Sequence, residues 1–282
     1  MGAAVSVLLA LAGVGQSQPE ADTAKLVKAW LAVCKGHAEA YVMSPAEKPE
    51  EKFKMLPEPI FRHSQPVRGD DIGAVWLWVQ ADGRPAAVGT VFAFSYNAGG
   101  GGNRWMAHEF HSLLDQPLLA LWRGKKQWAP AKPGLEWKPI PGSTAPAGYP
   151  LGAPAQRGRQ MTELSRQFQA HEIDKRNSRW ELRLVAKPVY RYELKKTDAA
   201  LDGAMFVFCQ GTDPEIFLLI EARPTTEGPR WFYACATFSD YEVHVRHRET
   251  EVWVDQIAPY EDRAAPHWLQ GYIEKTKLPQ KE

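Results

Sequence analysis

Gly73-Ala74-Val75-Trp76-Leu77-Trp78-Val79-Gln80 is the stretch that decides the fold, because every position between Gly73 and Gln80 is apolar. Successive side chains of a strand point to opposite faces, so both faces of this strand need an apolar cover. A second stretch, residues 203–210 (GAMFVFCQ), has the same property. The sequence therefore predicts two strands that are each buried between two layers. We expect four core residues from them and their neighbours: Val75, Leu77, Val207 and Phe217.

The two stretches belong to a longer similarity within the chain. Matched residues keep their order and nearly the same offset, which is typical of two diverged copies of one unit. The matches include Pro59 with Pro188, Arg62 with Arg191, Trp105 with Trp231, and Trp128 with Trp253.

Each copy is expected to begin with a helix. Apolar residues recur at three- and four-residue spacing over about residues 22–41, and again over about residues 157–172 through Phe168 and His171. Alternating strands follow both segments. We therefore predict an α+β fold of two tandem diverged copies, each a helix followed by an antiparallel β-meander. The predicted organisation is copy 1 at 18–128, a Pro/Gly-rich linker at 129–158 that cannot join a central sheet, copy 2 at 159–275, and a polar tail at 276–282.

The first 17 residues have the pattern of a signal peptide. Residues 3–14 (AAVSVLLALAGV) form an apolar run, and Gly15-Gln16-Ser17 offers a small-x-small cleavage site. The run is too short to span a bilayer, and no later stretch reaches transmembrane length. No Lys or Arg precedes it, which departs from the usual pattern. We expect export to the periplasm or the outside of the cell.

Composition limits the partners. The 282 residues carry 34 Lys and Arg against 33 Asp and Glu, a formal net charge of +1. This balance gives no general attraction for nucleic acid and does not fit an acidic disordered chain. Cys34, Cys209 and Cys235 can form one disulfide with one thiol left over, but their spacing favours three buried small side chains.

Motifs of familiar enzymes are absent from the sequence, so no catalytic residue and no cofactor are assigned. There is no nucleotide-binding glycine loop, G-x-S-x-G elbow, H-E-x-x-H or paired C-x-x-C. The best candidate is His108-Glu109-Phe110-His111, in which Glu109 and His111 share one face of a strand. A carboxylate and an imidazole placed in this way can bind a ligand, coordinate a metal or act as an acid–base pair.

The second copy qualifies this candidate. His108 and Phe110 match Ala234 and Ala236, so His108 is expected in the core. Two ligands do not make a metal site, and a third would have to come from His63, Asp70 or Asp71. We therefore assign no metal, expect Glu109, His111 and His63 as ligand-binding residues, and favour a structural role for the Glu109–His111 pair.

Tryptophan offers another candidate, because 11 Trp in an exported β-rich chain can stack on sugars. Most of them match an aromatic residue in the other copy and are expected in the core. Five have no aromatic counterpart: Trp30, Trp122, Trp137, Trp180 and Trp268.

Several segments together resemble an uncharacterised family of predicted exported bacterial proteins. The resemblance covers most of residues 50–255 and implies no activity, cofactor or catalytic residue. Its segments are Trp180-Glu181-Leu182-Arg183-Leu184, Pro188-Val189-Tyr190-Arg191-Tyr192, Gln210-Gly211-Thr212-Asp213-Pro214-Glu215 and His108-Glu109-Phe110-His111-Ser112-Leu113.

The function expected from the sequence is that of a non-enzymatic binding or interaction module for a protein or small ligand. One alternative is a metal-assisted hydrolase using Glu109 and His111. Another is a glycan-binding module using the Trp residues that lack a counterpart.

Overall fold

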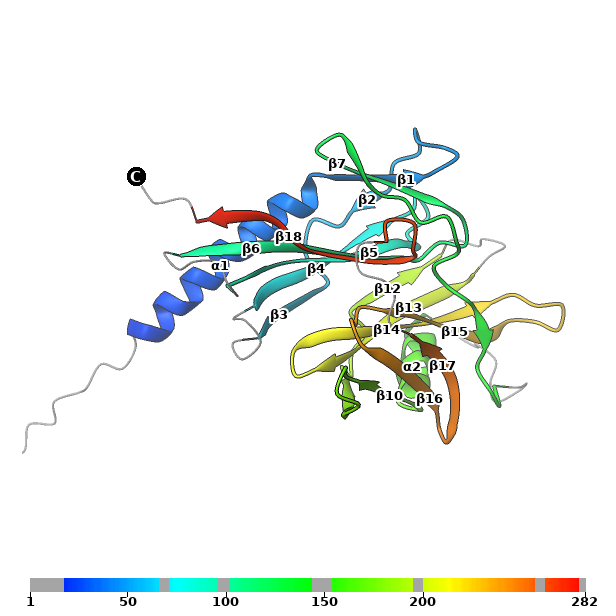
Figure 1. Cartoon of the computed structure of the whole chain (residues 1–282). Helices are drawn as coiled ribbons and strands as arrows, with labels where there is room; N and C mark the ends of the chain where they lie inside the picture. The colour runs from blue at the N-terminus through cyan, green and yellow to red at the C-terminus, as the bar shows by residue number, and fades with distance from the viewer. Residues whose placement is uncertain are drawn as a thin grey trace, which may run out of the picture.

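Three antiparallel sheets build most of the chain (Figure 1). The computed structural model describes residues 18–65, 71–95, 102–143, 154–194, 200–256 and 262–278. Strand makes up 52% of the described residues, which contain two helices and eighteen strands. The predicted signal peptide lies outside these residues. Among the helices that are described, none is long and apolar enough to cross a membrane.

The first sheet has six strands in the order β18-β6-β5-β4-β2, with β3 also paired to β4. Helix α1 (Gln18–Glu39) packs on β4 and β5. A separate three-stranded sheet in the order β1-β7-β8 flanks it. The strands of these two sheets are β1 (Tyr41–Pro45), β2 (Lys54–Met55), β3 (Phe61–Gln65), β4 (Asp71–Val79), β5 (Pro85–Phe94), β6 (Asn103–Ser112), β7 (Leu118–Trp122), β8 (Lys125–Trp128) and β18 (His267–Lys277).

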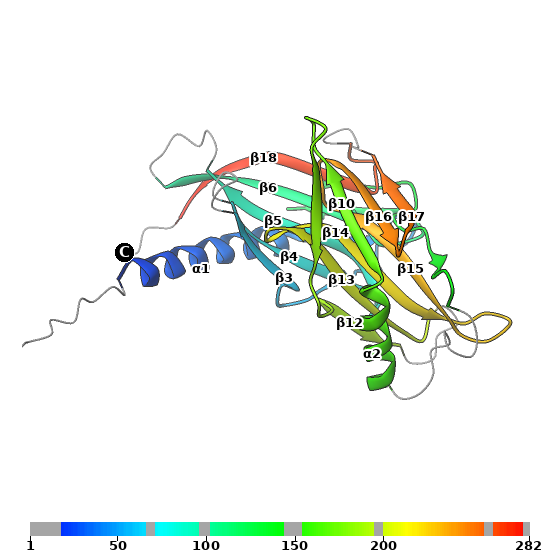
Figure 2. The same cartoon turned by 90° about the horizontal axis from the view of Figure 1, so that it is seen from below.

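The second large sheet has nine strands in the order β17-β16-β10-β11-β13-β14-β15-β9, with β12 also paired to β13. Helix α2 (Pro154–Ser165) packs on β13 and β14, as Figure 2 shows. Its strands are β9 (Lys138–Pro139), β10 (Phe168–Ile173), β11 (Arg179–Leu184), β12 (Tyr190–Glu193), β13 (Asp202–Gln210), β14 (Asp213–Arg223), β15 (Arg230–Thr237), β16 (Glu242–His247) and β17 (Thr250–Asp255).

The predicted burial of both strand faces is confirmed. Trp76 and Trp78 of β4 pack in one apolar cluster with Trp30 of α1. The alternate residues Val75 and Leu77 belong to a different cluster, which lies between the two large sheets and includes residues of β13 and β14. The four predicted core residues, Val75, Leu77, Val207 and Phe217, are all fully buried in this inter-sheet cluster.

The predicted fold class is wrong. The chain is mostly β, with three sheets including a half-barrel, and it is not a tandem helix-plus-meander α+β arrangement. Neither large sheet is made from one contiguous copy. Strand β18, most of which belongs to the predicted second copy, pairs with β6 of the first sheet, and the two lie side by side in Figure 1. This pairing satisfies backbone groups that β6 would otherwise expose at a sheet edge.

The second predicted helix also ends earlier than expected. Phe168 and His171 lie in β10, which pairs with both β11 and β16. The predicted linker contributes β9, which pairs with β15 at the outer edge of the nine-stranded sheet. Pro139 is tolerated there because an edge strand leaves one side of its backbone unpaired.

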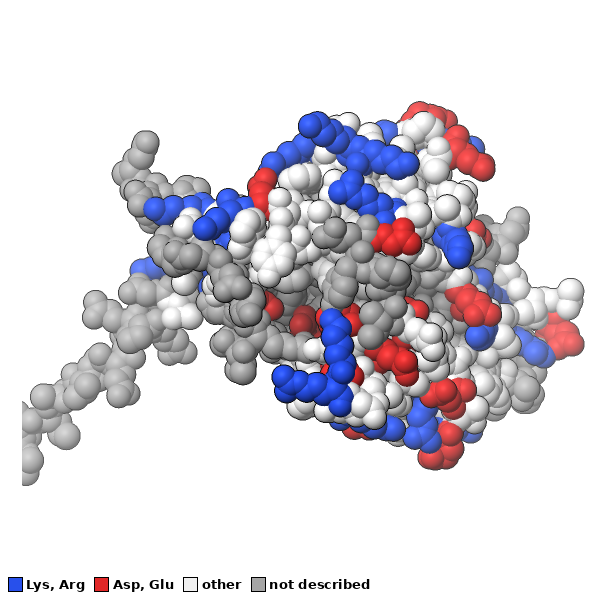
Figure 3. Space-filling model, viewed as in Figure 1, with Lys and Arg blue, Asp and Glu red and all other residues white. Residues whose placement is uncertain are grey.

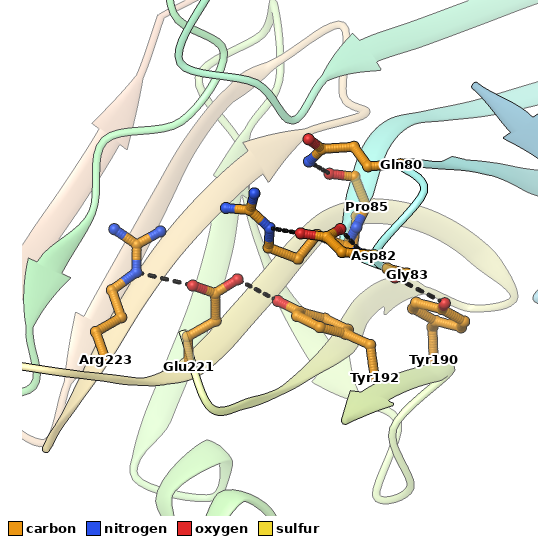
Figure 4. Close-up of polar contacts among 9 residues, drawn as sticks. Gln80, Asp82, Gly83, Pro85, Tyr190, Tyr192, Glu221 and Arg223 are labelled. Carbon is orange, nitrogen blue, oxygen red and sulfur yellow. Dashed lines mark hydrogen bonds and ion pairs between the residues drawn. The ribbon is translucent and has the colours of Figure 1, made fainter. Parts of the chain in front are cut away.

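A hydrogen bond between the two large sheets lies beside a buried polar network of the nine-stranded sheet (Figure 4). The Tyr190 hydroxyl of β12 donates to the carbonyl of Gly83, in the turn between β4 and β5, at 2.9 Å. Next to it, the buried Tyr192 hydroxyl donates to Glu221, whose second oxygen accepts from Arg223 Nε at 2.8 Å. Burial and the Glu221 charge raise the pKa of Tyr192. Both oxygens of Glu221 have protein partners, so this network is structural.

The inter-sheet cluster should dominate stability. Leu77→Ala and Phe217→Ala are each expected to lower the free energy of unfolding by about 2–5 kcal/mol, because each leaves a cavity between two rigid sheets. Val42→Ala, at an exposed position of β1, is the control and should change it by less than about 0.5 kcal/mol. Denaturant titration measures all three. A loss below about 1 kcal/mol for both core variants would contradict the packing described.

Candidate functional site

A cavity of about 920 Å³ opens between the two large sheets. Its volume lies within the range of ligand-binding sites for small organic molecules. One wall comes from β3, β4, β5, β6 and β18, and the other from β14 and the segments that follow β10 and β15. The residues that line it are His63, Asp71, Thr90, Phe92, Phe94, Ala107, Glu109, Lys175, Asp213, Glu215, Phe238, Asp240, Tyr241, Leu269, Gly271 and Tyr272.

The register of the first sheet explains why the cavity begins where it does. Leu77 pairs with Val88, and both face the inter-sheet cluster. One step along the same face, Thr90 pairs with Glu109. The inner face of the sheet therefore changes from apolar to polar, and the close sheet-to-sheet packing gives way to the cavity.

The cavity lining is strongly acidic. Among the described residues, the lining holds five carboxyl groups and one ammonium group, that of Lys175, whose Nζ lies 3.4 Å from Asp240 Oδ2. Several Asp and Glu side chains are visible near the centre of the face shown in Figure 3. The five acidic residues are Asp71, Glu109, Asp213, Glu215 and Asp240.

Glu109 forms a buried pair with His267. Nε2 of His267 lies 2.7 Å from Glu109 Oε1. Burial, with the nearby charges of Asp213 and Asp240, raises the pKa of Glu109 well above its usual value, and burial lowers the pKa of His267 to about 4. Both shifts favour the neutral forms of the two groups, in which the Glu109 carboxyl donates its proton to the imidazole nitrogen in a hydrogen bond.

His111 does not join Glu109 in a site. Its Nδ1 and Nε2 contact the carbonyl oxygens of Thr237 and Gly134 at 3.1 and 2.9 Å. Only the charged ring can donate to both carbonyls, but burial outweighs this and lowers the pKa of His111 to about 4, so the neutral ring donates to one of them. Both nitrogens face the backbone, and His111 does not line the cavity. The expectation that it binds a ligand is not supported by this geometry.

A metal centre is not formed by the residues that were proposed for it. Within the described ranges, no group of three His, Cys, Asp or Glu side chains is placed to hold a metal ion. Asp70 lies outside those ranges, whereas Asp71 lines the cavity together with His63 and Glu109.

His63 is held by one side of its ring. Its Nε2 lies 3.0 Å from Thr90 Oγ1, and Thr90 Oγ1 in turn lies 3.1 Å from the carbonyl of Ala74. The other ring nitrogen, Nδ1, has no hydrogen-bond partner and lies 3.6 Å from Asp213 Oδ1. Burial lowers the pKa of His63, and the Asp213 charge opposes this shift only in part.

Gly73 makes this position of His63 possible. The two residues are paired across β3 and β4. A Cβ at Gly73 would lie 2.5 Å from His63 Nε2 and 2.5 Å from the Phe92 Cβ. The missing side chain lets the imidazole ring lie across β4 and reach Thr90 on β5.

Aromatic side chains form one side of the cavity. The pairing of β18 with β6 is irregular between Gln270 and Glu274, and Tyr272 within this bulge has a left-handed φ of 57°. Such a bulge redirects a side chain. The Tyr272 ring, 53% exposed, packs edge-on against Phe94 at 5.3 Å and Trp105 at 5.4 Å. The cavity therefore combines an acidic floor with an apolar rim.

The Trp residues without a counterpart do not assemble into a sugar-stacking surface. Trp30 and Trp268 are buried. Guanidinium groups lie over the rings of Trp122 and Trp137, from Arg123 at 4.1 Å and Arg223 at 3.9 Å. Trp180, 48% exposed, is on β11.

Two expectations about buried residues are confirmed. His108 is fully buried and its Nδ1 contacts the Tyr41 hydroxyl at 2.8 Å. Cys34, Cys209 and Cys235 are free and buried. Sequence reasoning missed the contributions of Asp213, Asp240 and Tyr272 to the cavity. Asp213 follows a strand in a turn motif, which marks a loop but does not reveal what the loop faces.

Comparisons with models of protein families, with curated proteins and with solved structures found no match. The resemblance to a family of exported bacterial proteins therefore stays an expectation.

Glu109→Gln should stabilise the protein at about pH 8, and the gain should shrink toward pH 4.5. The folded protein keeps a proton on Glu109 at pH values where the unfolded chain, with a pKa of about 4.5, has released it. Wild-type stability therefore falls as pH rises from about 4.5 toward the higher pKa of the folded protein. The Gln amide still offers a donor to His267. Urea titrations at pH 5 and pH 8 measure the difference.

Glu249→Gln is the matched control, because its side chain is almost fully exposed and should show no such dependence on pH. If Glu109→Gln lowers stability equally at both pH values, the carboxyl is charged in the folded protein and the neutral pair is wrong.

Proposed function

We propose that the protein is a non-enzymatic binding protein whose cavity between the two large sheets takes a small organic ligand. The observation that carries the proposal is the cavity itself, about 920 Å³ with convergent polar groups and aromatic walls. Export, indicated by the apolar run at residues 3–14, is part of the proposal. The near-zero net charge supports the further expectation that nucleic acid is not the partner.

The energetic character of the lining supports a binding role. The buried Nδ1 of His63 has no hydrogen-bond partner, which lowers stability. A structural interior would be served better by the apolar residues found one step away, such as Leu77 and Val88. Proteins keep costly polar groups mainly where function needs them.

The two alternative functions, a metal-assisted hydrolase and a glycan-binding module, have less support. The hydrolase based on Glu109 and His111 lacks its second residue, because both nitrogens of His111 face backbone carbonyls. The glycan-binding alternative rests on Trp residues of which Trp30 and Trp268 are buried. The cavity depends on neither group.

Gly271→Trp tests the proposal by filling the cavity. Gly271 lines it, and a Cβ placed there meets no atom within 4 Å, so a Trp side chain fits at the cavity wall without displacing the backbone. We expect wild-type protein to give saturation-transfer NMR signals with neutral aromatic fragments such as benzyl alcohol. Gly271→Trp should reduce these signals at least about fivefold, as expected for a filled site.

Gly36→Trp is the control, since Gly36 is an exposed residue of α1 with equally open space around its Cβ. It should bind fragments as the wild type does. Fragment binding that survives in Gly271→Trp, or that is absent from the wild type, would contradict the proposed function.

A further inference from the structure

The hydrogen bonds around His63 determine which ring nitrogen carries the hydrogen. The Thr90 hydroxyl has one hydrogen, and the Ala74 carbonyl oxygen, 3.1 Å away, can only accept it. The 3.0 Å contact between Thr90 Oγ1 and His63 Nε2 therefore needs a hydrogen on Nε2. Burial lowers the pKa of His63, which favours the neutral ring. In that ring Nδ1 has no hydrogen and is an acceptor.

This acceptor receives no hydrogen from the protein. Within the described part of the chain, Nδ1 is buried and makes no hydrogen bond. Asp213 Oδ1 is 3.6 Å away, which is too far for a hydrogen bond. Because His63 lines the cavity, a ligand that fills this space also keeps water from Nδ1. The ligand must then supply a donor itself, or it leaves a buried acceptor unpaired at a cost in affinity.

The neighbouring strands hold the acceptor in one direction. The His63 ring lies over Gly73 of β4, where a Cβ would come within 2.5 Å of Nε2. Its Nε2 is bound to Thr90 on β5, so a rotated ring would lose that hydrogen bond. Nδ1 therefore keeps its direction toward Asp213, which also lines the cavity. An acceptor held in this way is preorganised for a ligand.

Aromatic side chains continue the cavity wall beside this acceptor. The Phe92 ring lies edge-on to the His63 ring, with 6.1 Å between the centroids. The wall extends over Phe94, 6.0 Å from Phe92, to Tyr272, 5.3 Å from Phe94. All three rings belong to the lining. An apolar or aromatic group gains contact area on such a wall.

We infer that the ligand is a neutral hydroxyl compound with an apolar body, whose O–H group donates to His63 Nδ1 while the body lies along Phe92, Phe94 and Tyr272. This inference rests on the proposed function and names the ligand class of the same cavity. A hydroxyl is a sufficient donor because the acceptor is an uncharged ring. A compound of the same shape with a carbonyl in place of the hydroxyl leaves Nδ1 unpaired, so the acceptor also determines specificity.

A matched pair of probes tests this with the full chain. Isothermal titration calorimetry at pH 8 compares 4-phenylbutan-2-ol with 4-phenylbutan-2-one. The two probes share one carbon skeleton and neither is charged, so a preference between them does not depend on the net charge of the lining. The alcohol can donate a hydrogen bond, whereas the ketone can only accept one. We expect the alcohol to bind about tenfold or more tightly, because the ketone leaves a buried acceptor without a donor.

Two variants locate the acceptor. His63→Leu removes both ring nitrogens and keeps a side chain of similar size, so it should bring the ratio of alcohol to ketone affinity close to one. Thr90→Val keeps the shape of Thr90 but removes the oxygen that holds the hydrogen on Nε2, so it should reduce the ratio. Thr250→Val, at an exposed position of β17 outside the lining, is the control and should retain the full ratio. Thermal melting checks that each variant is folded.

A measurement on the wild type gives the same test without a variant. In long-range ¹H–¹⁵N NMR spectra, the His63 Nδ1 resonance should move to lower frequency when 4-phenylbutan-2-ol is added, because its lone pair then accepts a hydrogen. The ketone should not cause this shift.

Each result separates the two ideas. Equal affinity for the alcohol and the ketone overturns the hydroxyl inference but leaves the binding cavity standing. A preference that survives in His63→Leu, or an Nδ1 resonance that the alcohol does not move, overturns the assignment of His63 as the acceptor. Binding of neither probe overturns the proposed function, and the inference falls with it.

Discussion

The apolar layer between the two large sheets is the contact on which the rest of the structure depends. Val75 and Leu77 of the first sheet meet Val207 and Phe217 of the second within one buried cluster. The opposite faces of the same strands are buried in separate clusters that include α1 on one side and α2 on the other. Each central strand is therefore buried on both faces. The shared cluster fixes the position of one sheet against the other, which a sheet with a single apolar face could not do while also packing on its helix.

The cavity is a consequence of where this layer ends. Along the inner face of the first sheet, the pair Leu77 and Val88 is followed by the pair Thr90 and Glu109. The polar pair cannot continue the apolar packing without a desolvation penalty. The protein limits that penalty by pairing Glu109 with His267, and the other four carboxylates line the cavity beside this pair. The same change of residue type thus separates the sheets and creates the chemistry between them.

The burial of both faces of β4 and β13 was predictable from the sequence. Unbroken apolar runs indicate burial on both faces, which identified Val75 and Val207 and required no knowledge of topology. The partner of β18 was not predictable, because β6 lies far away in sequence and strand pairing leaves little local signal. The end of the second helix was misjudged for a related reason. Phe168 and His171 fit a helical spacing, but their backbone groups pair with β11 and β16 instead.

The candidate site shows the same limit at the scale of single residues. Glu109 and His111 share a face of β6, as alternation requires, yet Glu109 meets the cavity and His111 meets two backbone carbonyls. Alternation determines the direction of a side chain, whereas the facing sheet determines what it contacts.

The protonation state of His63 likewise follows from residues on two other strands. The Thr90 hydroxyl donates its hydrogen to the Ala74 carbonyl, so its contact with His63 Nε2 needs a hydrogen on the imidazole. Long-range ¹H–¹⁵N NMR of the histidine rings, with the His63 signals assigned by their loss in His63→Gln, tests it most directly. We predict a neutral His63 with its hydrogen on Nε2 at pH 8. A ring protonated on both nitrogens, or a neutral ring with its hydrogen on Nδ1, would contradict the account.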